Sequence, residues 1–222
     1  MISWSPLLIT LKLALITTSI LFLIAVPVAY WLAYGRSKLT VLFEAIVALP
    51  LVLPPSVLGF YLLVGLSSQS MLGAFLATHF DLNIPFTFTG LVIGSIIYSM
   101  PFMVQPIQAG FQQLPPVLKE ASYVLGKSRW QTLINILLPN IKNSLLTGIV
   151  LSFAHTIGEF GVVLMIGGNL NKTRVASIAI YDSVNRLDYS SAHSYSLILL
   201  LFSFVILILV YIFNKKGFTS VR

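Results

Sequence analysis

The stretch Pro115–Pro139, PPVLKEASYVLGKSRWQTLINILLP, is the longest run of this chain that water would accept. Its charged side chains lie between two strongly apolar segments, and they are Lys119, Glu120, Lys127 and Arg129. A charged side chain in the hydrocarbon of a bilayer costs at least about 2.5–3.5 kcal/mol. We therefore predict that this stretch lies outside the bilayer and has a structure of its own.

A short amphipathic helix is predicted at the start of this stretch. The Pro115-Pro116 pair ends the preceding helix and suits the first turn of a new one. Apolar side chains then recur at helical spacing, at Val117, Leu118, Ala121, Val124 and Leu125. Gly126 is expected to end the helix, because glycine readily adopts the left-handed conformation there. About two turns are too short to be stable alone, so we expect the helix to dock in a groove of a protein partner.

The spacing of this stretch resembles the EAA loop of ABC-importer membrane subunits, whose pattern is E-A-A-x3-G-x9-I-x-L-P. Glu120-Ala121 is followed by Gly126 and, after nine intervening residues, by Ile136-x-Leu138-Pro139. Ser122 replaces the second alanine, and its small side chain is expected to preserve close docking. The resemblance implies a coupling helix that sits in a cleft of a cytoplasmic ATPase subunit. The predicted ATPase-coupling residues are Leu118, Glu120, Ala121, Ser122 and Gly126.

A phosphate-binding P-loop is a competing interpretation of the same residues. Ala121-x4-Gly126-Lys127-Ser128 fits a relaxed form of that pattern. A P-loop lies between a buried strand and the start of a helix in an α/β domain, and the sequence of this chain indicates no such domain. We therefore expect no cofactor on this chain, with ATP and Mg bound by the partner ATPase subunit.

Composition predicts an all-α integral membrane protein. The chain is 57% hydrophobic and 9% charged, whereas a soluble domain carries about 25% charged residues. It has no cysteine, which excludes disulfides, and its histidines show no metal-ligand spacing, so no metal site is expected. The net charge of +7 indicates basic cytoplasmic loops and not a nucleic-acid partner.

Five apolar runs reach the length of about 20 residues that a membrane span needs. The predicted spans are residues 7–34, 40–66, 88–111, 141–166 and 195–213, and residues 1–222 form one permease domain with the coupling loop at 115–139. No basic region precedes the first run, so we expect a retained span and not a signal peptide. The chain ends soon after the fifth span, so we expect no C-terminal regulatory domain. A further short helix over residues 175–186 either lies on the outer face or dips into it.

The basic residues predict the orientation in the membrane. One side receives nine of them: Arg36, Lys38, Lys119, Lys127, Arg129, Lys142, Lys215, Lys216 and Arg222. The other side receives Lys172, Arg174 and Arg186, with Lys12 nearby. Since basic residues are enriched on the cytoplasmic side, we expect the first set there. The N-terminus is then outside and the C-terminus in the cytoplasm. The resemblance to ABC-importer membrane subunits implies a multi-pass protein of the bacterial inner membrane, surrounded by lipid.

Two spans carry features of a transport pathway. Prolines at Pro50, Pro54 and Pro55 break the helical hydrogen-bond ladder of the second span, and freed backbone groups must then be buried or line a wet cavity. The bent helix either lines a pathway or only shapes packing. Polar residues of the third span are either interhelical contacts or a pathway wall. The candidates are Pro54, Pro55, Ser56 and Gly59 in the second span and Ser99 and Gln105 in the third.

Glu159 in the fourth span is interpreted as the only acidic residue well inside a span, which makes it a functional candidate by default. His155 lies one helical turn earlier, next to Thr156. One histidine and one glutamate are too few ligands for a metal, and no nucleophile accompanies them, so no catalytic residue is predicted. We expect a structural pair or a gate element. Gly158 and Gly161 are expected to let another backbone approach closely.

A second resemblance concerns the substrate. Segments 49–62 and 158–182 are similar to the corresponding segments of molybdate/tungstate ABC permeases, of which sulfate permeases are close relatives. The similarity is carried by Gly158-Glu159-Phe160-Gly161, by Thr173-Arg174 and by the run that ends at Tyr181. It implies an ATP-driven importer that works by alternating access. The expected partners are ATPase subunits, a second permease copy and an extracytoplasmic oxyanion-binding protein.

Other functions explain the sequence less well. A permease for sulfate or another small solute is the nearest alternative. An ion-coupled secondary transporter would need an intramembrane ion site and usually two repeated halves, and no repeat is visible. An intramembrane enzyme would need a Ser–His, Asp–Asp or metal constellation, and the sequence contains none. A membrane anchor would explain neither the kinked polar spans nor the loop.

Overall fold

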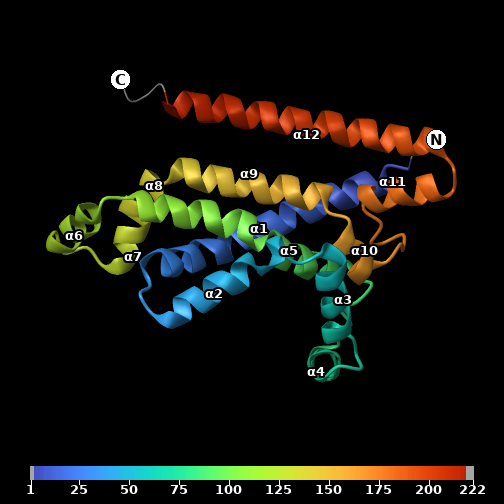
Figure 1. Ribbon diagram of the computed structural model, residues 1–222, viewed down its shortest axis with the longest axis horizontal. Coiled ribbons are helices and arrows are strands. Elements are labelled where there is room, and N and C mark those ends of the chain that lie inside the picture. Colours follow the sequence, from blue (N-terminus) through green and yellow to red (C-terminus); the bar gives the residue numbers. More distant parts are fainter. Residues whose placement is uncertain (1–2, 219–222) are drawn as a thin grey trace.

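The fold is an elongated bundle of helices, as seen in a computed structural model that describes residues 3–218, with side chains to residue 208. Within these residues all regular secondary structure is helical, which confirms the predicted all-α class. The long segments α1 (Ser5–Tyr34), α2 (Lys38–Ala48), α5 (Phe88–Gln113), α9 (Lys142–Gly158) and α12 (Tyr189–Phe218) run along the long axis in alternating directions (Figure 1). This alternation is expected of successive membrane crossings.

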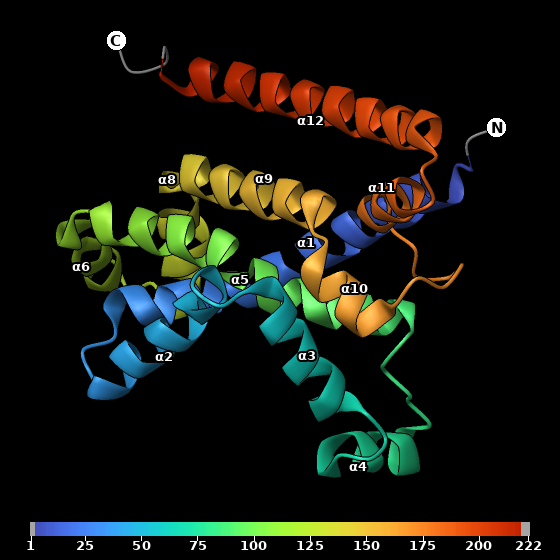
Figure 2. The same ribbon diagram turned by 45° about the vertical axis from the view of Figure 1, so that its right-hand side comes forward.

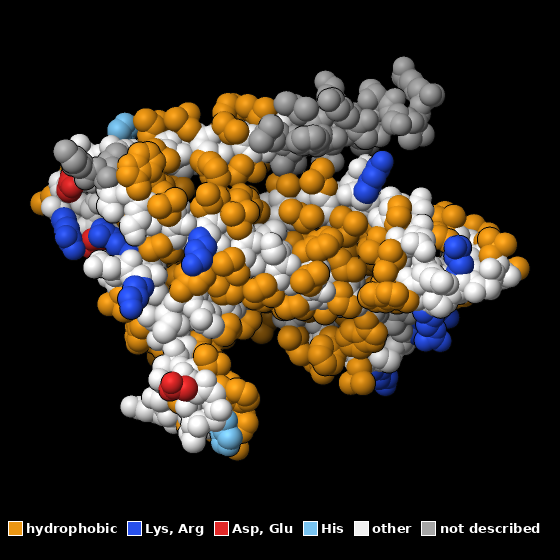
Figure 3. Space-filling view, turned by 180° about the vertical axis from the view of Figure 1, so that it is seen from behind, with side chains coloured by type: hydrophobic (Ala, Val, Ile, Leu, Met, Phe, Trp, Pro, Cys, Tyr) orange, Lys and Arg blue, Asp and Glu red, His pale blue; other side chains and the backbone are white. Residues whose placement is uncertain are grey.

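Three of the described helices are long and apolar enough to cross a membrane: α1, α5 and residues Tyr189–Ile208 of α12. Two bent helix pairs also pass as broken spans, so the described residues provide three to five candidate spans. Figure 3 shows hydrophobic side chains over most of the middle of the molecule and most Lys and Arg side chains toward its two ends. This distribution fits a bilayer around the middle.

The core lies between α1, α5 and α9. Leu21, Ala25 and Ala29 of α1 are fully buried, as are Met103 and Ile107 of α5. A second cluster forms nearer the start of α1, where Leu13, Leu91, Val163, Ile166 and Ile178 meet. The α5 helix continues through Pro101 and Pro106 without a break. The two clusters hold the middle of the bundle together and position the polar residues of α5 against α9.

The second predicted span is broken and not merely bent. After α2 comes the 3-10 turn η1 (Leu49–Leu51), and α3 (Pro55–Leu66) then leaves at 112°. Pro54 has an extended ψ of 135°, and neither Pro54 nor Pro55 can donate a backbone hydrogen bond to continue the ladder. With α4 (Met71–Phe80), α3 forms an arm that projects from the bundle (Figure 2).

The predicted fourth span, residues 141–166, is not one continuous helix in the structure. The α9 helix ends at Gly158, and α10 (Gly161–Gly167) is a separate short helix. Glu159 between them has extended backbone angles of φ −67° and ψ 136°, and its carbonyl oxygen accepts a hydrogen bond from Ser177 Oγ at 2.6 Å. This side-chain contact replaces a helical hydrogen bond, and it stabilises a break that the apolar pattern of the sequence conceals.

Two further helices complete the far end of the bundle. The helix expected near residues 175–186 is α11 (Ala176–Asn185), and Thr10 Oγ1 accepts a hydrogen bond from the Ala176 amide at 2.8 Å. Arg174 and Arg186 both pair with Asp182, at 2.6 Å and 3.2 Å. The α12 helix begins six residues before the predicted fifth span. It packs on α11 and α9, and only a small part of its surface is buried.

Candidate functional site

The coupling loop at 115–139, called the docking loop below, begins with the predicted short helix. Its first helix is α6 (Pro116–Val124), followed by α7 (Arg129–Thr132), the π-helical turn η2 (Leu133–Leu137) and α8 (Leu138–Asn140). Gly126 has a φ of +77°, and its amide donates to Tyr123 while the Lys127 amide donates to Ser122. This Schellman arrangement ends α6, as the glycine predicted. The backbone then bends by 78° at Ile141 into α9.

One face of α6 is open to solvent. Val124 is 87% exposed, Leu125 76% and Val117 62%, and Glu120 and Ala121 are also exposed. Leu118 is half-buried. An exposed apolar face on a short helix needs a partner in order to leave water. The residues predicted to couple are therefore available for docking, with one exception.

The exception is Ser122, which is buried and faces its own loop. Its Oγ lies 2.7 Å from Thr132 Oγ1, and Thr132 Oγ1 in turn donates to the Ser128 carbonyl oxygen. Ser122 thus ties α6 to α7 and does not belong to the open face. A capping box between Ser128 and Gln131 fixes the start of α7. The Gly126-Lys127-Ser128 residues therefore form a helix-to-helix turn, and no strand precedes them within the described residues.

The polar residues of α5 and α9 meet in the middle of the bundle. Ser95 Oγ donates to Glu159 Oε2 at 2.9 Å, and Ser99 Oγ lies 3.0 Å from His155 Nδ1 and 3.1 Å from Thr156 Oγ1. We call these five residues the α5–α9 polar seam. Within the described residues, His155 and Glu159 form no hydrogen bond or ion pair with each other. Each bonds to a serine of α5, so the expected structural pair is in fact two interhelical contacts.

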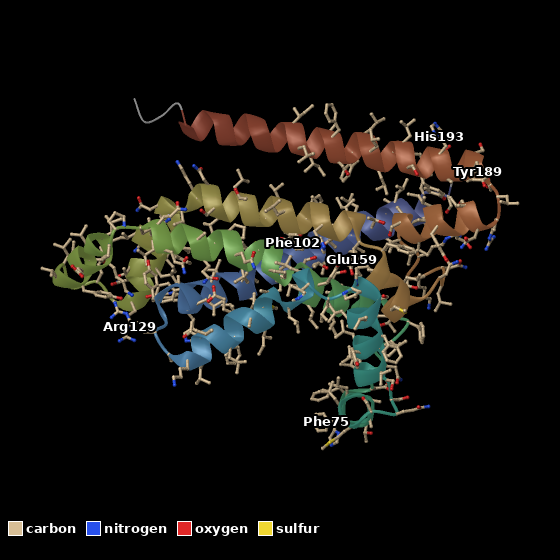
Figure 4. All side chains as sticks on the ribbon, viewed as in Figure 1. Phe75, Phe102, Arg129, Glu159, Tyr189 and His193 are labelled. Carbon is tan, nitrogen blue, oxygen red and sulfur yellow. The ribbon has the colours of Figure 1, made fainter. Side chains whose placement is uncertain are left out.

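Glu159 is 4% exposed, and its Oε1 atom has no hydrogen-bond partner among the described residues. Most buried polar atoms in proteins have such a partner, so a half-satisfied carboxylate in a membrane protein points to a functional position. Figure 4 places Glu159 and Phe102 near the middle of the long axis. The His155 ring stacks on Phe102 with 4.1 Å between the ring centroids, and it also contacts Tyr98.

A cavity of about 560 Å³ opens beside the polar seam. Its lining includes Pro55, Ser56, Tyr98, His155, Gly158 and Glu159. Segments far apart in sequence, the start of α3 and the α9–α10 break, therefore contribute to one space. The lining combines apolar and aromatic surface with an imidazole and a carboxylate, and no fixed cation faces the cavity among the described lining residues. Such a surface offers only weak polar contacts to a passing solute.

The arm reaches the cavity through close contacts between α3 and α10. A Cβ atom on Gly59 would lie 2.7 Å from Met165 Cβ, and one on Gly161 would lie 2.5 Å from Pro55 Cβ. Both glycines therefore allow the two short helices to touch, as expected for Gly161. Gly158 has nothing within 4 Å of its Cβ position and lines the cavity instead.

The other predicted pathway residues lie around the cavity. Ser99 and Thr156 are buried, Ser99 contacts His155, and Pro54 is the capping residue just before α3. Gln105 lies outside the lining and is exposed, on the face of α5 that also carries Tyr98 and Phe102. Gln105 is therefore related to Tyr98 and Phe102 only by its position on the same face of the helix.

Some functional positions escaped the sequence analysis. Glu44 also lies in a predicted span, close to its start, and the sequence analysis did not consider it. Glu44 Oε1 accepts a hydrogen bond from Gln108 Nε2 at 2.8 Å. The signal was the charge in the apolar run Val41–Val47. Tyr98 and Ser177 carried no comparable signal.

Comparison with known proteins now identifies the class of protein. Residues 25–217 match the family described as "Binding-protein-dependent transport system inner membrane component". The chain belongs to this family. It is the permease of an ABC importer, as the docking loop and the second resemblance implied.

Individual relatives of the permease differ in their named substrates. It is 44% identical over 205 residues to "Molybdenum transport system permease protein ModB" of Azotobacter vinelandii, covering 91% of this chain and 90% of that protein. It is 32% identical to the putative molybdenum permease YvgM of Bacillus subtilis, covering 96% and 93%. It is also 34% identical to the sulfate permease CysT of Escherichia coli, covering 75% and 60%.

Solved structures support the fold of the permease. A chain of the MetNI methionine ABC transporter in an inward-facing conformation matches with a TM-score of 0.72 at 17% identity, covering 95% of this chain and 94% of that one. A chain of a bacterial alginate ABC transporter in complex with a periplasmic protein matches with a TM-score of 0.77 at 19% identity, covering 94% and 76%. At these identities the likeness concerns the fold alone.

Proposed function

We propose that this permease carries molybdate across the bacterial inner membrane in an ATP-driven importer. The observation that carries the proposal is the 44% identity to a molybdenum permease over 91% of the chain. The lack of a cation in the cavity lining agrees with a path that must release its solute, because tight binding slows release. Capture of the oxyanion then belongs to a separate extracytoplasmic binding protein.

The proposed assembly contains two copies of the permease, two cytoplasmic ATPase subunits and the binding protein. A bundle with this few spans does not enclose a path alone, and a two-fold axis between identical subunits solves this simply. The exposed apolar side chains of the α3–α4 arm, among them Phe60, Met71 and Phe75, are available for such an interface. The permease contributes no catalytic residue, since ATP and Mg are bound by the ATPase.

The proposed mechanism is alternating access driven through α6. Closure of the ATPase dimer on ATP moves the docked α6 helices together. The Ser122–Thr132 contact passes this movement to α7, and the bend at Ile141 passes it to α9. The polar seam then shifts α5 with α9 and changes the cavity beside Glu159. This is a rigid-body transition of packed helices.

Uptake into proteoliposomes tests the substrate. The permease is reconstituted with its ATPase subunit and its binding protein, and uptake of radiolabelled molybdate is followed with and without ATP. We expect ATP-dependent uptake that excess tungstate blocks and excess sulfate does not. Equal competition by sulfate would assign the permease to the sulfate branch, which its 34% identity to CysT keeps as the second candidate. Uptake that persists without ATP would contradict an ATP-driven importer.

A further inference from the structure

A polar pocket of about 390 Å³ lies where α1 ends beside α6 and α7. Its lining includes Tyr30, Trp31, Tyr34, Lys119, Tyr123 and Arg129. Four aromatic rings and two cations therefore surround one space at the end of the molecule that carries the docking loop. Figure 4 shows Arg129 at this end, far from Glu159 along the long axis. The transport mechanism above makes no use of this pocket.

The two cations of the pocket are not neutralised, and Lys119 lies over aromatic rings. Lys119 Nζ lies 4.0 Å from the centre of the Tyr34 ring and 5.4 Å from that of Tyr30. A cation over an aromatic face is attracted to the ring but keeps its charge. Within the described residues, neither Lys119 nor Arg129 forms an ion pair with a carboxylate. The pocket therefore presents unneutralised positive charge to a ligand.

The aromatic side chains add hydrogen-bond donors. Desolvation, and then the neighbouring Tyr30, raise the pKa of Tyr123. A protonated phenol can donate a hydrogen bond to an oxyanion. Trp31 is 41% exposed, which is typical of the tryptophans that lie at a membrane–water boundary.

An apolar groove of about 260 Å³ is lined by residues of the same α1 helix and of the segment that begins with α7. Its lining includes Leu23, Pro27, Trp130, Ile134 and Leu138. Leu23 is 72% exposed, Trp130 67% and Ile134 44%, so apolar surface is open here. The groove runs between α1 and the α7–α8 segment.

The pocket and the groove lie along one face of α1, and we treat them as two parts of one trough. On α1, Leu23, Pro27, Tyr30 and Tyr34 are spaced four, three and four residues apart, which places them on one face of the helix. On the opposite wall, Arg129 of the pocket precedes Trp130 of the groove. We call the whole trough the α1–α7 groove. One of its ends is cationic and aromatic, and the other is apolar.

We propose that the α1–α7 groove binds an anionic phospholipid of the cytoplasmic leaflet, with its phosphodiester between Lys119 and Arg129 and an acyl chain along Leu23, Ile134 and Leu138. Basic pockets between membrane helices on the cytoplasmic side suit anionic lipid headgroups. A free phosphate would use the cationic end alone and would leave the apolar end open.

A lipid in this groove would connect two moving parts. Its headgroup would contact α6 through Lys119 and α7 through Arg129, and its chain would lie on α1. The exposed residues Glu120, Val124 and Leu125 stay free for the ATPase, because Lys119 points toward α1. Anionic lipid would therefore fix the base of α6 against the first span. This inference concerns the lipid around the permease and is independent of the solute that it carries.

Lipid association measured by electron paramagnetic resonance tests the proposal directly. The purified ABC complex is placed in phosphatidylcholine nanodiscs with spin-labelled phosphatidylglycerol or spin-labelled phosphatidylcholine. For the unaltered protein, we expect an immobilised fraction that strongly favours phosphatidylglycerol. In the double variant Lys119→Gln/Arg129→Gln, this preference should fall by roughly thirtyfold, since each of the two cations near an anionic headgroup contributes about 1 kcal/mol and about 1.36 kcal/mol is a factor of ten.

The matched control is Lys38→Gln/Lys142→Gln, which removes the same charge at exposed sites outside the groove. This control should keep the preference for phosphatidylglycerol. An equal loss in the control would mean that the preference depends on the total positive charge of the protein and not on the groove, and it would overturn the proposal. Equal association of both lipids with the unaltered protein would also overturn it, whatever the variants do.

Two further arms separate a lipid from a free anion. Excess inorganic phosphate should leave the immobilised fraction unchanged, and short-chain dihexanoyl phosphatidylglycerol should compete roughly tenfold less well than the long-chain lipid, because it buries fewer methylene groups. Displacement by phosphate, or equal competition by the short chain, would mean a site for the phosphate group only and would contradict the apolar half of the groove.

Discussion

Glu159 combines deep burial with a carboxylate oxygen that has no partner among the described residues. The sequence indicated Glu159 as a candidate functional residue because acidic residues inside membrane spans are rare and usually have a function. Its partner Ser95, 64 residues away, could not be predicted, because polar pairs between helices depend on helix rotation and depth. Glu44 was missed because a charged residue near the end of an apolar run looks like a residue that lies outside the membrane in water.

The first prediction concerns the free oxygen of Glu159. In Glu159→Gln one acceptor becomes an amide donor, while the remaining oxygen can still accept from Ser95. We expect the complex to assemble normally and ATP-driven uptake to fall by roughly tenfold, because the free oxygen can no longer accept a hydrogen bond during the transport cycle. Uptake per assembled complex is the measurement, with assembly checked by size-exclusion chromatography. Normal uptake kinetics in this variant would mean that Glu159 serves only the packing of the helices.

The second prediction concerns Ser99, which bonds to the half-buried His155 and the buried Thr156. Ser99→Ala leaves His155 Nδ1 and Thr156 Oγ1 without this contact, so we expect a loss of about 1–3 kcal/mol in stability, measured by thermal unfolding in detergent. Ser19→Ala is the control, because Ser19 is exposed and bonds only to the Leu15 carbonyl oxygen. Equal melting temperatures for the two variants would contradict the polar seam.

At the scale of elements, α6 was the most predictable part of the chain. Its start at a proline pair and its end at Gly126 are local features, so the sequence contains them. The break at Glu159 was not predictable, because the Ser177 contact that stabilises it comes from another helix. The docking role of Ser122 was likewise inferred from its place in the motif, whereas the direction of its side chain depends on α7.

The third prediction separates the two roles of Ser122. Ser122→Ala removes one hydrogen bond and keeps the space, so substrate-stimulated ATP hydrolysis should stay within about twofold of normal. Ser122→Leu cannot fit a site that is 1% exposed, so it should separate α6 from α7 and abolish most of the stimulation. Normal stimulation in the leucine variant would contradict the Ser122–Thr132 contact as part of the coupling path.

The fourth prediction concerns the left-handed backbone of Gly126. No atom lies within 4 Å of its Cβ position, so a side chain there meets only backbone strain. Asparagine tolerates this conformation, and β-branched residues do not. We expect Gly126→Asn to keep most of the substrate-stimulated ATP hydrolysis and Gly126→Val to lose most of it. Equal activity of the two variants would show that the φ of +77° is not required.

At the scale of the whole molecule, the sequence predicted alternating passes with the docking loop at one end. It did not predict the α3–α4 arm, because a proline-broken helix and a bent one have the same hydropathy. The arm and the α9–α10 break together create the cavity, which is why its location required the structure. The orientation in the membrane still depends on the distribution of basic residues alone.

The central claim is that α6 lies in the cytoplasm, where the ATPase holds it. The chain has no cysteine, so Val124→Cys on the open face of α6 and Lys172→Cys at the opposite end each give a single reactive thiol. Both variants are treated with a membrane-impermeant maleimide, in intact cells and in inside-out vesicles. The account predicts that Lys172→Cys reacts in cells, and that Val124→Cys reacts only in vesicles and is protected when the ATPase subunit is bound. Reaction of Val124→Cys in intact cells would contradict it.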